Sequence, residues 1–379
     1  MTTRAPAPRR SVETPGLDRR VDEAESSTVV VWRGEEIAFR SVAERITRTS
    51  DRRERDALYA AYEDAFEALN PLYEERLTAW REHGDLVRWA AKRGTDPEAL
   101  ALDLERFSLN VETPYYAALR RYLALVDVEQ GDGSEADVWH VTRGSTWSQW
   151  FGDREVSRAL HAVGRSSGES TDLDGWRGAE RQLAGTPAPG TAMDAVGAAY
   201  ATLVGSPEWL ADELGVTSDE VAAFGDFAAF VRLLRLRRAH AELQYELRLF
   251  TEDDPAIQRA YYSGMVGHMT GVAVGEAGYL GGIARPFASV SRLETALLGA
   301  MLVEVLERRY GPHWWRDPAS TELADRVGSA EKLDHALAEL GYDALDWRPV
   351  LRQIRTRLIG EMSGYGGPNI TTRAGTRKV

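Results

Sequence analysis

Apolar residues recur at every third or fourth position along most of this chain, which is the period of an amphipathic helix. Between residues 51 and 83 this period is carried by Leu58, Tyr62, Ala65 and Leu69, and Pro71 is expected to kink or break the helix. The same spacing predicts further helices at residues 96–107, 115–126, 153–166, 289–310, 333–340 and 347–358. The pattern therefore predicts a mainly α fold with little β structure.

Local signals refine these boundaries. Thr217 is followed three residues later by Glu220, which is the form of a capping box and predicts the start of a helix that runs to about Phe250. Two short segments, 29–32 and 137–141, favour strands. We expect three regions: a disordered tail at 1–27, a single mostly helical domain at 28–362, and a flexible basic tail at 363–379. Within the domain, the Gly-, Ser- and Pro-rich residues 166–190 predict a long loop or flap.

Composition narrows the functional classes. The 379 residues carry a formal net charge of −13, which disfavours binding to nucleic acid because no net basic field attracts phosphates. Cysteine is absent, which excludes disulfides, thiolate metal sites and a cysteine nucleophile. No apolar stretch has the length of a membrane helix, and the N-terminus has no secretory signal. We therefore expect a cytoplasmic protein without a membrane partner, and the Arg-, Ala- and Gly-rich composition is typical of a high-GC bacterium.

A helical chain with scattered histidines calls for a search for a zinc site. The common helical motif places two histidines four residues apart, with a glutamate after the first as the general base. The seven histidines of this chain include no pair four residues apart, and none is followed directly by glutamate. The motif is therefore absent.

An ordered series of segments nevertheless resembles a known family. The series consists of residues 206–210 (SPEWL), 237–247 (RRAHAELQYEL), 304–315 (EVLERRYGPHWW) and 340–346 (LGYDALD). Together they resemble the C-terminal half of the thimet oligopeptidase and oligoendopeptidase-F group of gluzincin metallopeptidases, over roughly residues 136–358. The resemblance implies a zincin-like oligopeptidase scaffold with a deep cleft.

The resemblance also implies a degenerate zinc site. It places the metal motif of the family on residues 160–165, where His161 stands for the first ligand, Ala162 for the catalytic glutamate and Arg165 for the second ligand. The third ligand falls on Asp194. Ala162 cannot accept a proton, and the permanent cation of Arg165 would repel Zn²⁺. We therefore expect neither a metal nor another cofactor.

The expected function is that of a zinc-independent, repurposed peptidase fold. The resemblance places the substrate-orienting residues of the family near Arg292 and Glu294. We expect an acid–base enzyme that acts on a small anionic or amide-bearing substrate, in a setting such as bacterial natural-product or antibiotic biosynthesis. The expected catalytic residues are His161, Asp194 and Glu294, and the expected substrate-binding residues are Arg165, Arg292, His268 and Tyr245.

Several alternatives stay open at this level. Arg165 with Asp194, and Arg292 with Glu294, could instead form structural ion pairs that fill a dead site. The protein could be a non-catalytic pseudopeptidase that binds a peptide or small molecule, or a metal-dependent peptidase whose ligands are residues such as His161, Asp194 and His268. The arginines of the longest predicted helix are interpreted as a solvated helix face; they are Arg232, Arg235, Arg237 and Arg238.

Overall fold

The computed structural model describes residues 14–82, 84, 86–91, 94–129, 131–142, 192–215, 218–251 and 254–358. Its first part contains the elements α1 (Pro15–Ser27), β1 (Val29–Trp32), β2 (Glu35–Ala38), α2 (Phe39–Arg48), α3 (Arg52–Arg81), α4 (Leu86–Ala91), α5 (Pro97–Ala124) and α6 (Glu135–Thr142). Strands β1 and β2 form an antiparallel hairpin in which Val30 is opposite Ile37. The mainly α prediction is confirmed.

The second part continues with helices. They are α10 (Ala192–Ala201), α11 (Pro207–Leu214), α12 (Ser218–Leu249), α13 (Pro255–Thr270), α14 (Ala288–Tyr310), α15 (Pro318–Gly328), α16 (Leu333–Leu340) and α17 (Arg348–Leu358), with short 3₁₀ turns η1 (Thr202–Gly205), η2 (Ala277–Tyr279) and η3 (Trp314–Arg316). The helices predicted at 289–310, 333–340 and 347–358 agree with α14, α16 and α17 to within one residue at each end.

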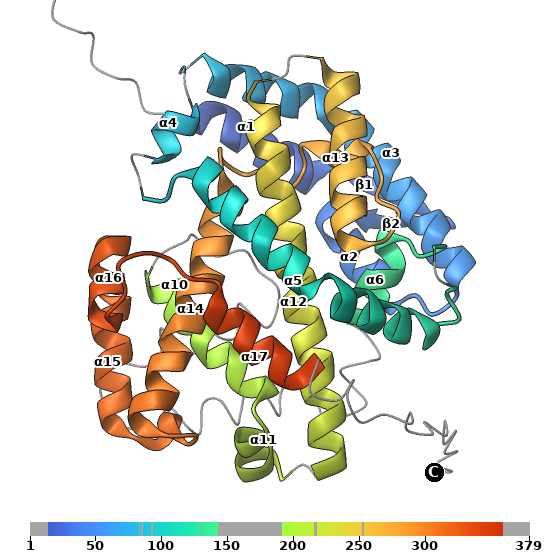
Figure 1. The fold of residues 1–379 in the computed structure, drawn as a ribbon. Coiled ribbons are helices and arrows are strands. Elements are labelled where there is room, and N and C mark those ends of the chain that lie inside the picture. Colours follow the sequence, from blue (N-terminus) through green and yellow to red (C-terminus); the bar gives the residue numbers. More distant parts are fainter. Residues whose placement is uncertain are drawn as a thin grey trace, which may run out of the picture.

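Helix α12 runs through the middle of the molecule and connects its two ends (Figure 1). It packs against α5, α11, α13, α14 and α17 along its length. Its buried side chains, which include Phe227, Leu233, Leu236 and Leu243, lie on more than one side of the helix. A helix that is apolar on several sides is typical of a core position, so α12 is the element around which the other helices assemble.

Several helices begin at the same local sequence, a capping residue followed by proline. Asp96, Asp254 and Asp317 each accept a hydrogen bond from the backbone N–H of the first helical turn, and a proline occupies the next position in each case. The proline loses nothing there, because the N–H that it lacks would have no partner inside the helix. These helix starts are therefore encoded locally.

The segment 137–141, predicted as a strand, is helix α6. Ser134 precedes the helix, and its hydroxyl accepts a hydrogen bond from the backbone N–H of Asp137 at 3.2 Å. The Asp137 carboxylate in turn accepts a hydrogen bond from the Ser134 N–H at 3.1 Å. This reciprocal pair is a capping box, which begins a helix whatever the β propensity of the residues that follow.

Two other expectations also differ from the structure. Residues 15–27, expected to be part of a disordered tail, form helix α1, which packs on α3 with Val21 buried. The helices expected at 96–107 and 115–126 are one continuous helix, α5, that passes through Pro114. Buried residues such as Val111, Tyr115 and Leu119 line the stretch around the proline, so packing stabilises the helix across it. The predicted helix 153–166, the loop 166–190 and the tail 363–379 lie outside the described residues.

Candidate functional site

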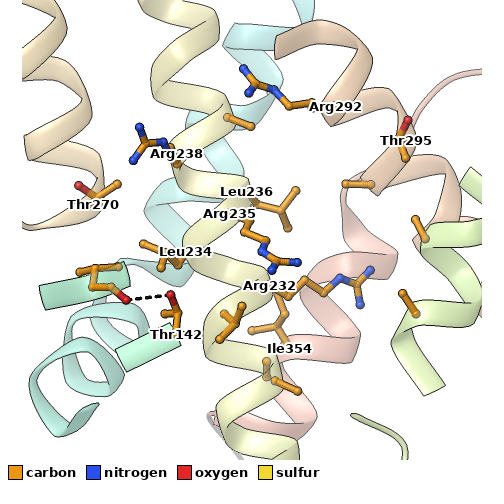
Figure 2. A pocket seen from close by; sticks show the side chains of 18 of the residues that line it. Thr142, Arg232, Leu234, Arg235, Leu236, Arg238, Thr270, Arg292, Thr295 and Ile354 are labelled. Atoms are coloured by element: carbon orange, nitrogen blue, oxygen red, sulfur yellow. Dashed lines mark hydrogen bonds between the residues drawn. The ribbon is translucent and has the colours of Figure 1, made fainter. Parts of the chain in front are cut away.

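A cavity of about 1260 Å³ follows α12 and is the setting for the candidate site. Its walls come from α3 and α6 on one side of α12, from α13 and the loop 275–283, and from α14 and α17 on the other side. Figure 2 shows Arg238 on one side of α12, while Arg232 and Arg235 point to the other side, toward α17. The cavity therefore has charged groups on both sides of a single helix.

Four charged side chains from three helices form a chain of ion pairs in this cavity. Arg238 on α12 contacts Glu135 on α6, and its Nε lies 3.0 Å from Glu242 one turn later on α12. Glu242 also accepts a contact of 2.5 Å from Arg292 on α14. The two glutamates raise the pKa of Arg238 well above its usual value in spite of burial. Arg238 therefore stays charged at any physiological pH.

Tyrosine hydroxyls extend this network toward α3. Tyr59 donates a hydrogen bond of 2.7 Å to Glu135 and accepts one of 3.2 Å from the Gly275 N–H. The Tyr262 hydroxyl accepts a bond of 3.4 Å from Arg238. Burial, which acts together with the nearby carboxylates on Tyr59, raises the pKa of Tyr59 and Tyr262. Both phenols are therefore neutral hydrogen-bond donors at neutral pH.

Glu63 on α3 is a carboxyl group of the cavity wall with a shifted proton affinity. Burial raises its pKa, and the neighbouring Glu135 adds to this effect, while the hydrogen bond of 3.0 Å from the Ala277 N–H opposes it. The loop that supplies this bond approaches α3 closely at Gly275, where a Cβ atom would overlap the Glu63 carboxyl group. A partly buried carboxyl of raised pKa keeps its proton to a higher pH than an exposed one, which favours a role in proton transfer.

Glu246 is the second carboxyl group with a raised pKa. It is fully buried, and burial raises its pKa to about 8 although Arg292 and a hydrogen bond of 2.8 Å from Ser289 oppose the shift. Its Oε1 atom has no hydrogen-bond partner among the described residues. Glu246 therefore carries a proton at neutral pH and presents no negative charge to Arg292.

The structure brings two of the seven predicted site residues into the cavity. Arg292 and Tyr245 line it. The Tyr245 ring packs against Tyr262 at 5.1 Å, and its hydroxyl has no hydrogen-bond partner among the described residues. His161 and Arg165 lie outside the described residues. Their expected roles stay predictions.

The other three predicted residues lie away from the cavity lining. Asp194 is buried on α10, which packs against α14 and α15. His268 is exposed in the last turn of α13, which packs against α12. Glu294 faces the turn before α5, where hydrogen bonds from Thr95 partly offset the raising of its pKa by burial. None of these three residues is among the described residues that line the cavity.

The alternative ion pair between Arg292 and Glu294 is wrong. Arg292 pairs with Glu242 instead, and Glu294 points toward Thr95. Residues two apart on a helix project in nearly opposite directions, so they do not face each other. The sequence proximity of the two residues was therefore misleading.

The arginines of α12 are also different from the expected solvated face. Arg237 is 2 % exposed, and it donates to the Met269 carbonyl at 2.7 Å while its guanidinium lies over the Tyr115 ring. Arg232 and Arg238 are partly buried in the cavity, and only Arg235 is exposed. The spacing of three residues between Arg232, Arg235 and Arg238, with Glu242 four residues later, is shared by many exposed helices. No pattern in the sequence around Glu63 or Glu135 indicates that either residue belongs to the site.

Comparison with known proteins bears on the fold. No protein-family model matches the sequence, and no curated protein matches it. Among solved structures, the chain is similar to oligoendopeptidase-F from Enterococcus faecium, with a TM-score of 0.62 and 12 % sequence identity over 92 % of this chain and 71 % of that chain. The chain has an oligoendopeptidase-F-like fold. At this identity the likeness concerns the fold alone.

Zinc is the metal that the family resemblance implies, and the donors in the described part of the chain do not fit it. No group of three or more His, Asp or Glu side chains there could hold a metal ion. Asp194 and His268, two of the alternative ligands, lie on helices in different parts of this oligoendopeptidase-F-like fold (Figure 1).

Among the described residues, no helix has both the length and the apolar character that a membrane span requires.

Proposed function

We propose that this protein is a zinc-independent enzyme that performs acid–base chemistry on a small anionic or amide-bearing substrate held in the cavity along α12. The observation that carries the proposal is the position of Glu63. This carboxyl group of raised pKa lines the same cavity as the paired arginines Arg238 and Arg292. A proton-transfer group beside fixed cations is the arrangement that such a reaction needs.

The roles follow from the chemistry of each group. Arg238 and Arg292 would polarise a carbonyl or stabilise negative charge that develops on the substrate, since neither loses its own charge. Glu63 would move the proton, and Tyr59 and Tyr262 would donate hydrogen bonds as neutral phenols. We assign the proton transfer to Glu63 rather than to Asp194 or Glu294, because only Glu63 lines the cavity. His161 could join this set, and that role stays a proposal.

The experiment is a turnover screen with one isosteric variant. Wild-type protein and Glu63→Gln are incubated with a mixture of small carboxylates and amides, with and without a strong zinc chelator, and consumption is followed by mass spectrometry. We expect a compound that wild type converts in the presence of chelator and that Glu63→Gln converts at least about a hundredfold more slowly, the size of a typical general acid–base contribution.

Other outcomes contradict the proposal in distinguishable ways. Turnover that stops with chelator and returns with added zinc would establish a metal-dependent peptidase. A compound that is retained unchanged by both proteins would establish a non-catalytic binding protein. Glu67→Gln is the matched control, because Glu67 lies one turn later on α3, is exposed, and pairs with Arg259 outside the cavity.

A further inference from the structure

Arg232 occupies a special position at the end of the cavity where α11, α12, α14 and α17 meet. Its Nη1 donates a hydrogen bond of 2.7 Å to the side-chain oxygen of Gln353 on α17. The amide nitrogen of Gln353 donates in turn to the Ala300 carbonyl on α14 at 3.1 Å. The guanidinium is therefore held in place by a neutral group that is itself anchored to a third helix.

Arg232 has no counter-ion in contact among the described residues. Arg238 and Arg292 each contact a glutamate, whereas no carboxylate of the described residues lies within 4.0 Å of Arg232. Its Nε and Nη2 atoms donate to no described residue, and they are not sealed from the cavity. Burial lowers its pKa to about 10, and the more distant Glu307 only partly opposes this shift.

The surroundings of Arg232 favour an anion. The lining at this end of the cavity is formed by the arginines Arg235, Arg308, Arg352 and Arg357 and by the glutamates Glu208, Glu304 and Glu307. Of these glutamates, Glu304 is already paired with Arg352. Among the described residues that line this end, arginines outnumber glutamates, although the whole chain carries a net charge of −13. A buried cation without a counter-ion is costly, and a bound anion would reduce that cost.

We propose that the guanidinium of Arg232, oriented by Gln353, binds the carboxylate group of a small organic ligand at this end of the cavity. The Nε–Nη2 edge offers two parallel N–H donors that match the two oxygens of a carboxylate. The ligand would lie on the side of α12 that faces α17, opposite to Arg238 (Figure 2). This site lies in the cavity of the proposed function, but its occupation does not require any reaction.

The experiment compares three probes that each contain six carbon atoms and differ in the polar group at one end. The affinities of sodium hexanoate, hexyl phosphate and neutral hexan-1-ol are measured by saturation-transfer NMR titration at constant ionic strength. Wild type should bind hexanoate more tightly than hexan-1-ol. Arg232→Gln should weaken hexanoate binding by about tenfold or more without changing the affinity for hexan-1-ol, and Arg232→Lys should be intermediate because lysine lacks the bidentate edge.

A second variant keeps the proposal testable if loss of Arg232 disturbs folding. Gln353→Glu keeps the shape of the side chain and supplies Arg232 with a carboxylate of its own. It should therefore abolish the preference for hexanoate while Arg232 remains. Arg248→Gln is the matched control, since Arg248 lies on the same helix, is exposed, and its guanidinium lies over the Tyr261 ring at 4.4 Å.

The remaining outcomes are decisive as well. Equal affinity for hexanoate and hexan-1-ol, or hexanoate binding that Gln353→Glu leaves unchanged, would overturn the carboxylate site. Tighter, Arg232-dependent binding of hexyl phosphate would replace the carboxylate by a phosphate. Glu63→Gln should retain hexanoate affinity, so a failure of the proposed catalysis would leave this site intact, and a failure of this site would leave the Glu63 result intact.

Discussion

Arg55 on α3 and Asp137 on α6 form an ion pair of 2.5 Å between side chains that are 1 % and 0 % exposed. Arg55 also donates to the carbonyls of Thr49 and Ser50 at 2.9 and 3.1 Å. The pair joins the end of α2 and the start of α3 to α6, the helix that carries Glu135 into the cavity. It is therefore a structural support for the candidate site.

Removal of this buried pair should be strongly destabilising. Asp137→Ala leaves the Arg55 cation buried without its partner, and we expect a loss of about 3–5 kcal/mol in the free energy of unfolding, measured by chemical denaturation. Asp56→Ala is the control, because Asp56 is exposed and its contact with Arg52 is 4.0 Å long. That variant should cost no more than about 1 kcal/mol. Equal losses for the two variants would contradict the prediction.

The same pair predicts a difference in acid stability. Burial alone would raise the pKa of Asp137, but hydrogen bonds from Arg55 and the Ser134 N–H, together with the charge of Arg55, hold that pKa below its usual value. A carboxyl with a depressed folded-state pKa stabilises the protein above its unfolded pKa of about 4, and this contribution disappears as the pH falls further. The stability gap between wild type and Asp137→Ala should therefore narrow between pH 5 and pH 3, both about one unit from that value.

Glu246 predicts the opposite dependence on pH. Burial raises its folded-state pKa to about 8, so the folded protein holds a proton that the unfolded chain loses near pH 4.5. Between these values the folded state binds more protons, and stability must fall as the pH rises. Glu246→Gln removes this slope. We expect the free energy of unfolding of Glu246→Gln to increase relative to that of wild type as the pH rises. The total increase should be at most about 5 kcal/mol, and the difference should level off above pH 8.

Denaturation of both proteins at several pH values between those limits measures this effect. Parallel stability curves for wild type and Glu246→Gln would show that Glu246 is ionised in the folded protein.

Arg292 should control the proton affinity of Glu246. Its positive charge lowers the pKa of that carboxyl, so Arg292→Gln should raise the pKa above about 8. Carbon-13 NMR of glutamate side-chain carboxyls, assigned with Glu246→Gln, measures the shift. Glu294→Gln serves as the control because Glu294 faces Thr95 and does not appear among the groups that act on Glu246. An unchanged titration in Arg292→Gln would disprove the coupling.

Two adjacent glycines give a matched test of the loop that closes the cavity against α3. A Cβ atom at Gly281 would overlap the ring of Phe66, which packs against Phe39 at 5.0 Å and Tyr62 at 4.7 Å. Gly281→Ala should therefore cost about 1–3 kcal/mol of stability, as overpacking does. Gly282 has open space, so Gly282→Ala should be neutral or slightly stabilising. Thermal unfolding distinguishes the two, and equal effects would be inconsistent with close contact at Phe66.

The helices were largely predictable because their signals are local. The three- and four-residue period of apolar residues indicated α14, α16 and α17 to within one residue at each end. The errors have equally local or packing causes. At α6, the Ser134–Asp137 capping box outweighs β propensity. At Pro114, burial of the flanking residues maintains one helix where the sequence indicated two.

The candidate site was only partly predictable. Arg292 and Tyr245 were expected and line the cavity, whereas Glu63 and Glu135 come from helices that the sequence did not connect to any site. Their partners are far away in the chain, as when Tyr59 donates to Glu135 or Ala277 to Glu63. No periodic pattern reports contacts of that sequence separation.

The sequence by itself determined the elements of this protein and the chemistry it lacks. Helical period and N-cap residues are short-range properties, and the absence of cysteine and of a His-pair zinc motif is visible in the residues alone. Only the tertiary structure decided the partners of each charge. Arg238 and Arg232 have the same side chain on the same helix, yet one contacts two glutamates and the other a neutral glutamine. That difference arises because α6 and α17 pack on different sides of α12, and the energy of a charge depends on what surrounds it.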